Sequence, residues 1–177
     1  MRVLGVDCGT EITGYGVVET ASDGSLLHVE SGAIRMSPRN PLPERLSRIF
    51  DKLRLVIEQR QPDVVAIEDV FYAVNVKSAL KLGQVRGVAM LAASLSSLPV
   101  AEYAPLSIKS AVVGYGKADK AQVQHMVARL LRLAVLPEPP DVADALAIAI
   151  CHLHTSSTLD RQARTAAVSA SSHPTGN

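Results

Sequence analysis

Two short apolar segments, residues 3–6 and residues 64–67, each end in a carboxylate, Asp7 and Glu68. Short runs rich in Val and Ile and bounded by turn-forming residues are typical of buried strands. The chain has four Tyr, two Phe and no Trp, so its core must be built from Val, Ile, Leu and Ala. Such a core suits a sheet that is covered by helices. A hydrophobic content of 47% excludes disorder for most of the chain.

The order of the expected elements predicts a mixed sheet. Residues 14–18 and 29–34 are typical of two further strands, and the short connections make the first three strands an antiparallel meander. After that, helices and strands alternate, which is typical of parallel pairing. Helices are expected over residues 41–60, 75–98, 108–113, 120–133 and 141–152, with a fifth strand over 99–103. We therefore predict an α/β fold with five strands, in which the first and fourth strands are neighbours.

The predicted topology brings acidic residues together. Asp7 and Glu68 would lie at the carboxyl ends of adjacent parallel strands, where open α/β sheets bind ligands. Two carboxylates there repel each other unless a cation lies between them. Asp141 and Asp144, three residues apart at the start of a buried helix, share one face. If that helix packs beside the carboxyl edge of the sheet, all four carboxylates meet. Hard oxygen ligands favour magnesium or manganese over zinc, and a pair of such ions can activate water for attack on a phosphodiester.

Each acid also has a simpler structural explanation. Asp7 could begin a turn with Gly9, and Asp141 could cap a helix after Pro139 and Pro140. The cluster explains both strand ends and the helix start together. Residues 5–10 (GVDCGT) also resemble the first phosphate loop of actin-like ATPases and sugar kinases, but those proteins close two related domains around ATP and this chain has room for one.

The charge distribution indicates a basic middle third. Residues 70–135 contain eight lysines and arginines against two acidic residues, a local charge of +6 within a chain of net charge +1. This excess indicates a phosphate-binding face, although a solvated helical surface would look the same. Two cysteines exclude a disulfide framework and a four-Cys zinc site. We expect a cytoplasmic protein without a membrane span, with one domain over residues 1–154 and a disordered tail over 155–177.

Seven segments, taken in order, resemble the RuvC family of Holliday-junction resolvases. They are residues 7–10 (DCGT), 13–17 (TGYGV), 66–68 (AIE) with Phe71, 78–87 (SALKLGQVRG), 112–116 (VVGYG), 120–127 (KAQVQHMV) and 141–149 (DVADALAIA). The resemblance runs from residue 1 to about residue 154. It implies a ribonuclease-H-like fold, a homodimer and magnesium-dependent nicking of two strands of like polarity at a four-way DNA junction.

The resemblance also implies roles for single residues. The catalytic and metal-binding acids would be Asp7, Glu68, Asp141 and Asp144, holding two Mg²⁺ ions per site, with Mn²⁺ as a substitute. Phe71 would stack on a base near the crossover, and Lys109 and Lys120 would hold the DNA backbone. The products would be ligatable 5′-phosphate and 3′-hydroxyl ends, and the family implies cooperation with a RuvA–RuvB branch-migration complex. Cys8 stands where many members have Pro, which suggests a site sensitive to oxidation.

One further alternative is a module of the same fold that binds branched DNA without cutting it. Such a scaffold would keep the basic region but would have no need of a carboxylate cluster. The presence of all four acids therefore favours the nuclease.

Overall fold

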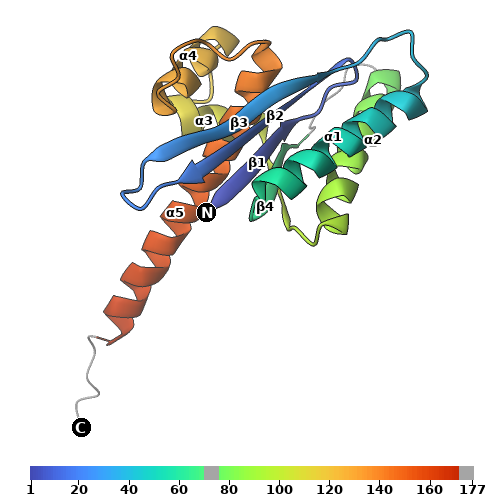
Figure 1. Cartoon of the computed structure of the whole chain (residues 1–177). Helices are drawn as coiled ribbons and strands as arrows, with labels where there is room; N and C mark the ends of the chain where they lie inside the picture. The colour runs from blue at the N-terminus through green and yellow to red at the C-terminus, as the bar shows by residue number, and fades with distance from the viewer. Residues whose placement is uncertain (70–75, 172–177) are drawn as a thin grey trace.

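The computed structural model describes residues 1–69 and 76–171, which form a five-stranded sheet between two layers of helices (Figure 1). The strands are β1 (Arg2–Asp7), β2 (Ile12–Thr20), β3 (Leu26–Arg35), β4 (Val64–Glu68) and β5 (Val100–Tyr103). The helices are α1 (Leu42–Arg60), α2 (Val76–Leu95), α3 (Pro105–Val113), α4 (Lys120–Leu130) and α5 (Pro140–Ser171).

The sheet has the order β3-β2-β1-β4-β5, and the predicted mixed topology is confirmed. β1 pairs antiparallel with β2 and parallel with β4, and β4 pairs parallel with β5. Val6 lies opposite Ile67 in the β1–β4 ladder, so the next residues, Asp7 and Glu68, lie side by side at the ends of their strands. The register alone therefore places the two strand-end carboxylates at one edge.

Alternation of side chains along the strands separates the core into two halves. One half packs Leu4 and Ile67 against α1 and α2, and the other packs Val3 and Ala66 against α3, α4 and α5. Figure 1 shows these two helical layers on opposite faces of the sheet. A strand buried on both faces must be apolar throughout, which explains why residues 3–6 and 64–67 contain no polar side chain.

Helix α5 lies directly on β1 and β2 because glycines let the two backbones approach. A Cβ atom on Gly5 would lie 2.1 Å from the Ala145 carbonyl oxygen, and one on Gly14 would lie 2.0 Å from that of Asp141. Neither distance is tolerable, so only glycine fits at these positions. The close contact fixes the first turns of α5 beside the end of β1.

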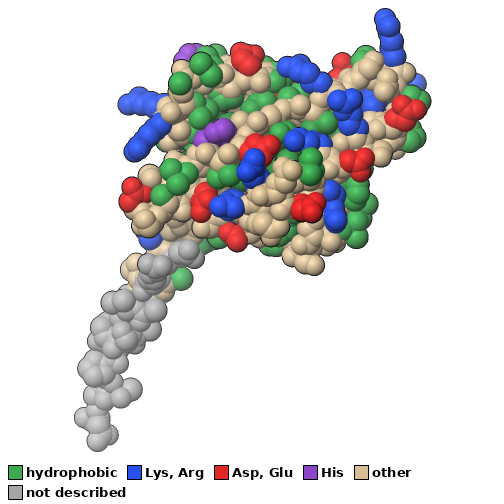
Figure 2. Space-filling model, viewed as in Figure 1, with side chains coloured by type: hydrophobic (Ala, Val, Ile, Leu, Met, Phe, Trp, Pro, Cys, Tyr) green, Lys and Arg blue, Asp and Glu red, His purple; other side chains and the backbone are tan. Residues whose placement is uncertain are grey.

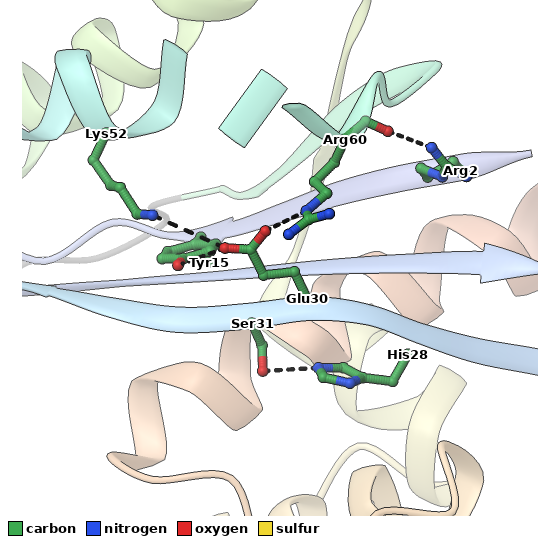
Figure 3. A network of polar contacts seen from close by, with 7 residues as sticks. All are labelled: Arg2, Tyr15, His28, Glu30, Ser31, Lys52 and Arg60. Carbon is green, nitrogen blue, oxygen red and sulfur yellow. Dashed lines mark hydrogen bonds and ion pairs between the residues drawn. The ribbon is translucent and has the colours of Figure 1, made fainter. Parts of the chain in front are cut away.

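A partly buried glutamate attaches α1 to the sheet on the other face (Figure 3). Glu30 on β3 accepts hydrogen bonds from the Arg60 guanidinium and from the Tyr15 hydroxyl, the latter at 3.1 Å. The Lys52 ammonium lies 3.9 Å from the same carboxylate and 5.1 Å from the centre of the Tyr15 ring. These cations lower the pKa of Glu30 against the effect of its burial, so the carboxylate stays ionised.

The end of α5 differs from the sequence-based prediction. The Ser- and Thr-rich composition predicted a disordered tail from residue 155, but α5 continues through Ser171 and extends away from the body of the molecule (Figure 1). Residues 141–171 contain no Gly or Pro, and the Thr155 and Thr158 hydroxyls donate to the carbonyls four residues before them. The domain boundary at residue 154 stays a prediction. Within the described ranges, no helix combines the length and hydropathy needed to cross a membrane.

Candidate active site

Three carboxylates face one pocket at the carboxyl edge of the sheet. Asp7 ends β1, Glu68 ends β4, and Asp144 lies one turn into α5; all three line a pocket of about 270 Å³. The apolar part of the wall comes from α3, α4 and α5, through Pro105, Ile108, Val123, Ala147 and Ile148. The pocket thus combines oxygen ligands from the sheet with an apolar wall.

The electrostatics of the pocket show how closely these acids act on one another. Burial, followed by the charges of Asp144, Glu68 and Asp141, raises the pKa of Asp7 to about 7. Burial and Asp144 also raise the pKa of Glu68, while Lys120 and Lys109 oppose that shift. Buried carboxylates of like charge stabilise one another's protonated forms. A cation bound between these carboxylates would therefore reduce their mutual repulsion.

Asp141 occupies a different position from the other three acids. Its charge reaches Asp7, but its side chain does not line the pocket. Among the residues that the structure describes, no three carboxylate, imidazole or thiol groups converge closely enough to form a ready-made metal site. The structure thus brings Asp7, Glu68 and Asp144 to one pocket and leaves Asp141 at its margin.

Two lysines, which the resemblance assigned to the DNA backbone, border the acids. Lys109 on α3 lines the pocket, and the Lys120 ammonium on α4 lies 3.3 Å from Asp144 Oδ2. A capping box between Asp119 and Gln122 fixes the first turn of α4 and so places Lys120. The Asp144 carboxylate is the main cause of the raised pKa of Lys120, and the side chain remains 79% exposed. It can therefore pair with Asp144 or reach a phosphate.

One arginine of the basic region predicted from the sequence is largely buried in the structure. Arg86 on α2 pairs with Asp69 and Glu102, and its side chain is 14% exposed. Its partners are 17 and 16 residues away in the sequence, Asp69 directly after β4 and Glu102 on β5, so no local pattern indicated the pairing. Phe71, the predicted stacking residue, lies outside the described residues.

Cys8 beside Asp7 does not have the properties of a reactive thiol. Burial raises its pKa to about 12, with a further contribution from the Asp7 carboxylate. The thiolate is the reactive form of cysteine, so this shift disfavours oxidation of Cys8; the sensitivity expected from the sequence stays a prediction.

The remaining charges are mixed over the surface drawn in Figure 2, where Lys and Arg side chains are interspersed with Asp and Glu. The excess of positive charge in residues 70–135 is therefore reduced in the folded chain, because Arg86 and Lys120 each have acidic partners. Lys109 and Lys120 are the basic residues of this region that line the acid pocket.

Comparison with known proteins places this geometry in a family. The family model of crossover junction endodeoxyribonuclease RuvC matches residues 3–152. A crossover junction endodeoxyribonuclease RuvC from Koribacter versatilis is 65% identical over 161 residues, covering 91% of this chain and 97% of the relative. The structure of Thermus thermophilus RuvC superposes with a TM-score of 0.82 at 34% identity, covering 89% of this chain and 96% of that one. The same protein in complex with a Holliday junction substrate gives a TM-score of 0.83 at 34% identity, with 88% and 94% covered. The ribonuclease-H-like chain described above therefore belongs to the RuvC family of crossover junction endodeoxyribonucleases.

Proposed function

We propose that this protein resolves four-way DNA junctions by nicking two strands of like polarity. The observation that carries the proposal is the pocket in which carboxylates from β1, β4 and α5 meet beside two lysines. Membership of a family of junction endonucleases supports the substrate, because a related chain is seen in complex with a Holliday junction. In each nick, a water oxygen attacks the scissile phosphorus and the bond to the 3′ oxygen breaks. The leaving oxygen takes a proton, which leaves 5′-phosphate and 3′-hydroxyl ends.

The acids fit divalent cations. Asp7, Glu68 and Asp144 offer hard oxygen ligands in one pocket. Burial, followed by the charges of the neighbouring carboxylates, raises the pKa of Asp7 to about 7. Asp141 is proposed as the fourth ligand, from the margin of the pocket. Magnesium, expected as two ions and replaceable by manganese, would activate the attacking water and stabilise the leaving oxygen.

The chain's own residues bind and orient the DNA strand. Lys109 and Lys120 border the acids, where their ammonium groups can form ion pairs with a phosphate of the strand. When Lys120 pairs with a phosphate, its ammonium moves away from Asp144, and that carboxylate is then available to bind a cation. The apolar wall beside them limits access of water to the pocket. Phe71, which follows Glu68 by three residues, is proposed to stack on a base at the crossover.

A homodimer would supply the two active sites that paired nicking needs. The face of α2 that carries Leu80, Leu91 and Leu95 is exposed, and Cβ atoms added to Gly83 and Gly87 would meet no other atom within 4 Å. A smooth apolar stripe of this kind suits close packing against a second copy about a twofold axis. We further propose that the protein is cytoplasmic and works with a RuvA–RuvB complex, as the family resemblance implies.

The test is cleavage of a labelled four-way junction with and without magnesium. We expect paired nicks only with the metal. Asp7→Asn should abolish cutting and leave junction binding within about twofold, because removing an acid does not weaken the attraction to phosphate. Asp51→Asn, at an exposed carboxylate on α1, is the matched control and should cut at the wild-type rate.

Three results would contradict the proposal in different ways. Binding without cutting by the wild-type protein would indicate a scaffold. A requirement for ATP would indicate a phosphotransferase. Loss of binding in parallel with cutting in Asp7→Asn would show that Asp7 is not purely catalytic.

A further inference from the structure

One arginine on α2 joins the end of β4 to the neighbouring strand β5. The Arg86 Nη1 atom lies 3.0 Å from Asp69 Oδ1, and its Nη2 contacts the Glu102 carboxylate. Asp69 directly follows Glu68, and Glu102 lies on β5. A single guanidinium on α2 therefore ties that helix to the end of β4 and to the neighbouring strand.

The same contacts fix the chain where it leaves β4. The Asp69 N–H donates to the Tyr103 carbonyl at 2.8 Å, which extends the β4–β5 ladder one residue beyond Glu68. The Asp69 side chain is held by Arg86. Glu68 thus lies between Ile67, which is paired with its neighbours in the sheet, and a residue anchored through both backbone and side chain. Its carboxylate has little freedom to turn away from the pocket.

Stability alone does not explain an arginine at this position. Its Nε is buried and has no hydrogen-bond partner among the described residues, and such an unmet donor on a charged group is costly. The Asp69 and Glu102 side chains are 37% and 45% exposed, and ion pairs with such exposed carboxylates contribute little to stability. What the planar guanidinium adds is geometry, because it holds two carboxylates in fixed directions. Arg86 itself does not line the pocket.

We infer that Arg86 is a positioning residue: by clamping Asp69 and Glu102 it holds the Glu68 carboxylate in place beside Asp7 and Asp144. The inference rests on the proposed function, since it assigns Glu68 to the reacting site. Arg86 acts through Asp69 and makes no contact with DNA. The clamp therefore affects the cutting step and the binding of the metal, and leaves the binding of the junction unchanged.

The experiment compares Arg86→Gln, Asp69→Asn and the double variant. Single-turnover cutting of pre-bound junction should fall about 10- to 100-fold in each single variant, the range typical of residues that orient metal ligands. Junction affinity should stay within about twofold. The double variant should be no slower than the slower single variant, because both changes remove the same contact. Arg86→Lys keeps the charge without the fork and should recover part of the rate.

A second readout does not depend on cutting. Manganese binding to the DNA-free protein, followed by calorimetry, should weaken about 10- to 100-fold in Arg86→Gln. Arg60→Gln, which breaks the ion pair between Arg60 on α1 and Glu30 on β3, is the matched control and should leave both readouts unchanged. If Arg86→Gln does not fold, the cutting rate and manganese affinity of Asp69→Asn and Arg86→Lys are compared with those of the wild-type protein instead.

The outcomes separate this inference from the proposed function. If the wild-type protein cuts the junction and the Arg86→Gln and Asp69→Asn variants cut it at the same rate, the clamp alone is overturned. The clamp is also overturned by a parallel fall in binding and cutting, which would make Arg86 a DNA contact, or by manganese binding equal to that of wild type. A wild-type protein that neither cuts the junction nor binds manganese would overturn the proposed function, and the clamp with it.

Discussion

Asp7 ends β1 where burial and three neighbouring carboxylates act on it together, and the sheet prevents it from moving away. Its pKa is about 7 in the folded chain, compared with the ordinary value of 3.8. Between these two values the folded protein holds a proton that the unfolded chain has lost. The contribution of Asp7 to stability is therefore fully present below about pH 4 and is lost as the pH rises through 7.

This shift predicts how the metal-free protein responds to pH. In a chelating buffer, Asp7→Asn should be more stable than wild type at pH 8, by a few kcal/mol, because each pKa unit corresponds to about 1.4 kcal/mol. The gain should shrink as the pH is lowered toward 4. Urea unfolding of both proteins at several pH values measures the difference. Equal midpoints at pH 8 would show that burial and the neighbouring carboxylates do not raise the pKa of Asp7.

At the scale of elements, the position of α5 decides whether the acids meet. Its first turns lie against β1 and β2 because Gly5 and Gly14 have no side chain. Asp141 and Asp144 lie on those turns, so the two glycines help to determine the positions of both carboxylates. Packing and chemistry are thus coupled through a backbone contact.

Gly14→Ala should therefore destabilise the protein and impair cutting together. The added methyl group would lie 2.0 Å from the Asp141 carbonyl, and backbone atoms must shift to admit it. We expect a loss of about 3 kcal/mol or more, at the upper end of the range for overpacked cores. Gly16→Ala meets mainly the Leu146 side chain and should be milder. Thermal unfolding and cutting rates test both variants, and a Gly14→Ala protein as stable as wild type would contradict the close contact.

The elements also show what the sequence could and could not predict. Strand and helix periodicity was enough for the mixed sheet, since a strand buried on both faces admits few sequences. The pairing of Asp7 with Glu68 followed from topology alone. The length of α5 was missed because Ser and Thr lower helix propensity, while hydrogen bonds such as that from Thr155 to the Cys151 carbonyl depend on the helix already being there. The Arg86 clamp needed three-dimensional proximity that no local spacing shows.

At the scale of the whole molecule, α2 and α5 lie on opposite faces of the sheet (Figure 1). Helix α2 buries Val85, Ala89, Ala92 and Ala93 against α1 and the sheet. Its opposite face carries the apolar stripe that we propose as the contact between two copies. The stripe and the acid pocket therefore occupy separate surfaces, so two copies can associate while both pockets remain open to DNA.

Leu91→Glu places a charge in the middle of that stripe and should give a monomer. Leu91 is 50% exposed, so the single chain loses little on substitution, whereas a buried unpaired carboxylate in an interface is costly. Sedimentation should show half the wild-type mass, and cutting of a junction in supercoiled DNA should stop at singly nicked circles, because one monomer carries one site. Leu27→Glu, at a leucine 48% exposed on β3, controls for a charge added elsewhere and should keep both the mass and the paired cuts. A Leu91→Glu protein with wild-type mass would move the dimer contact away from α2, and a monomeric wild-type protein that still nicks both strands together would remove the need for a dimer.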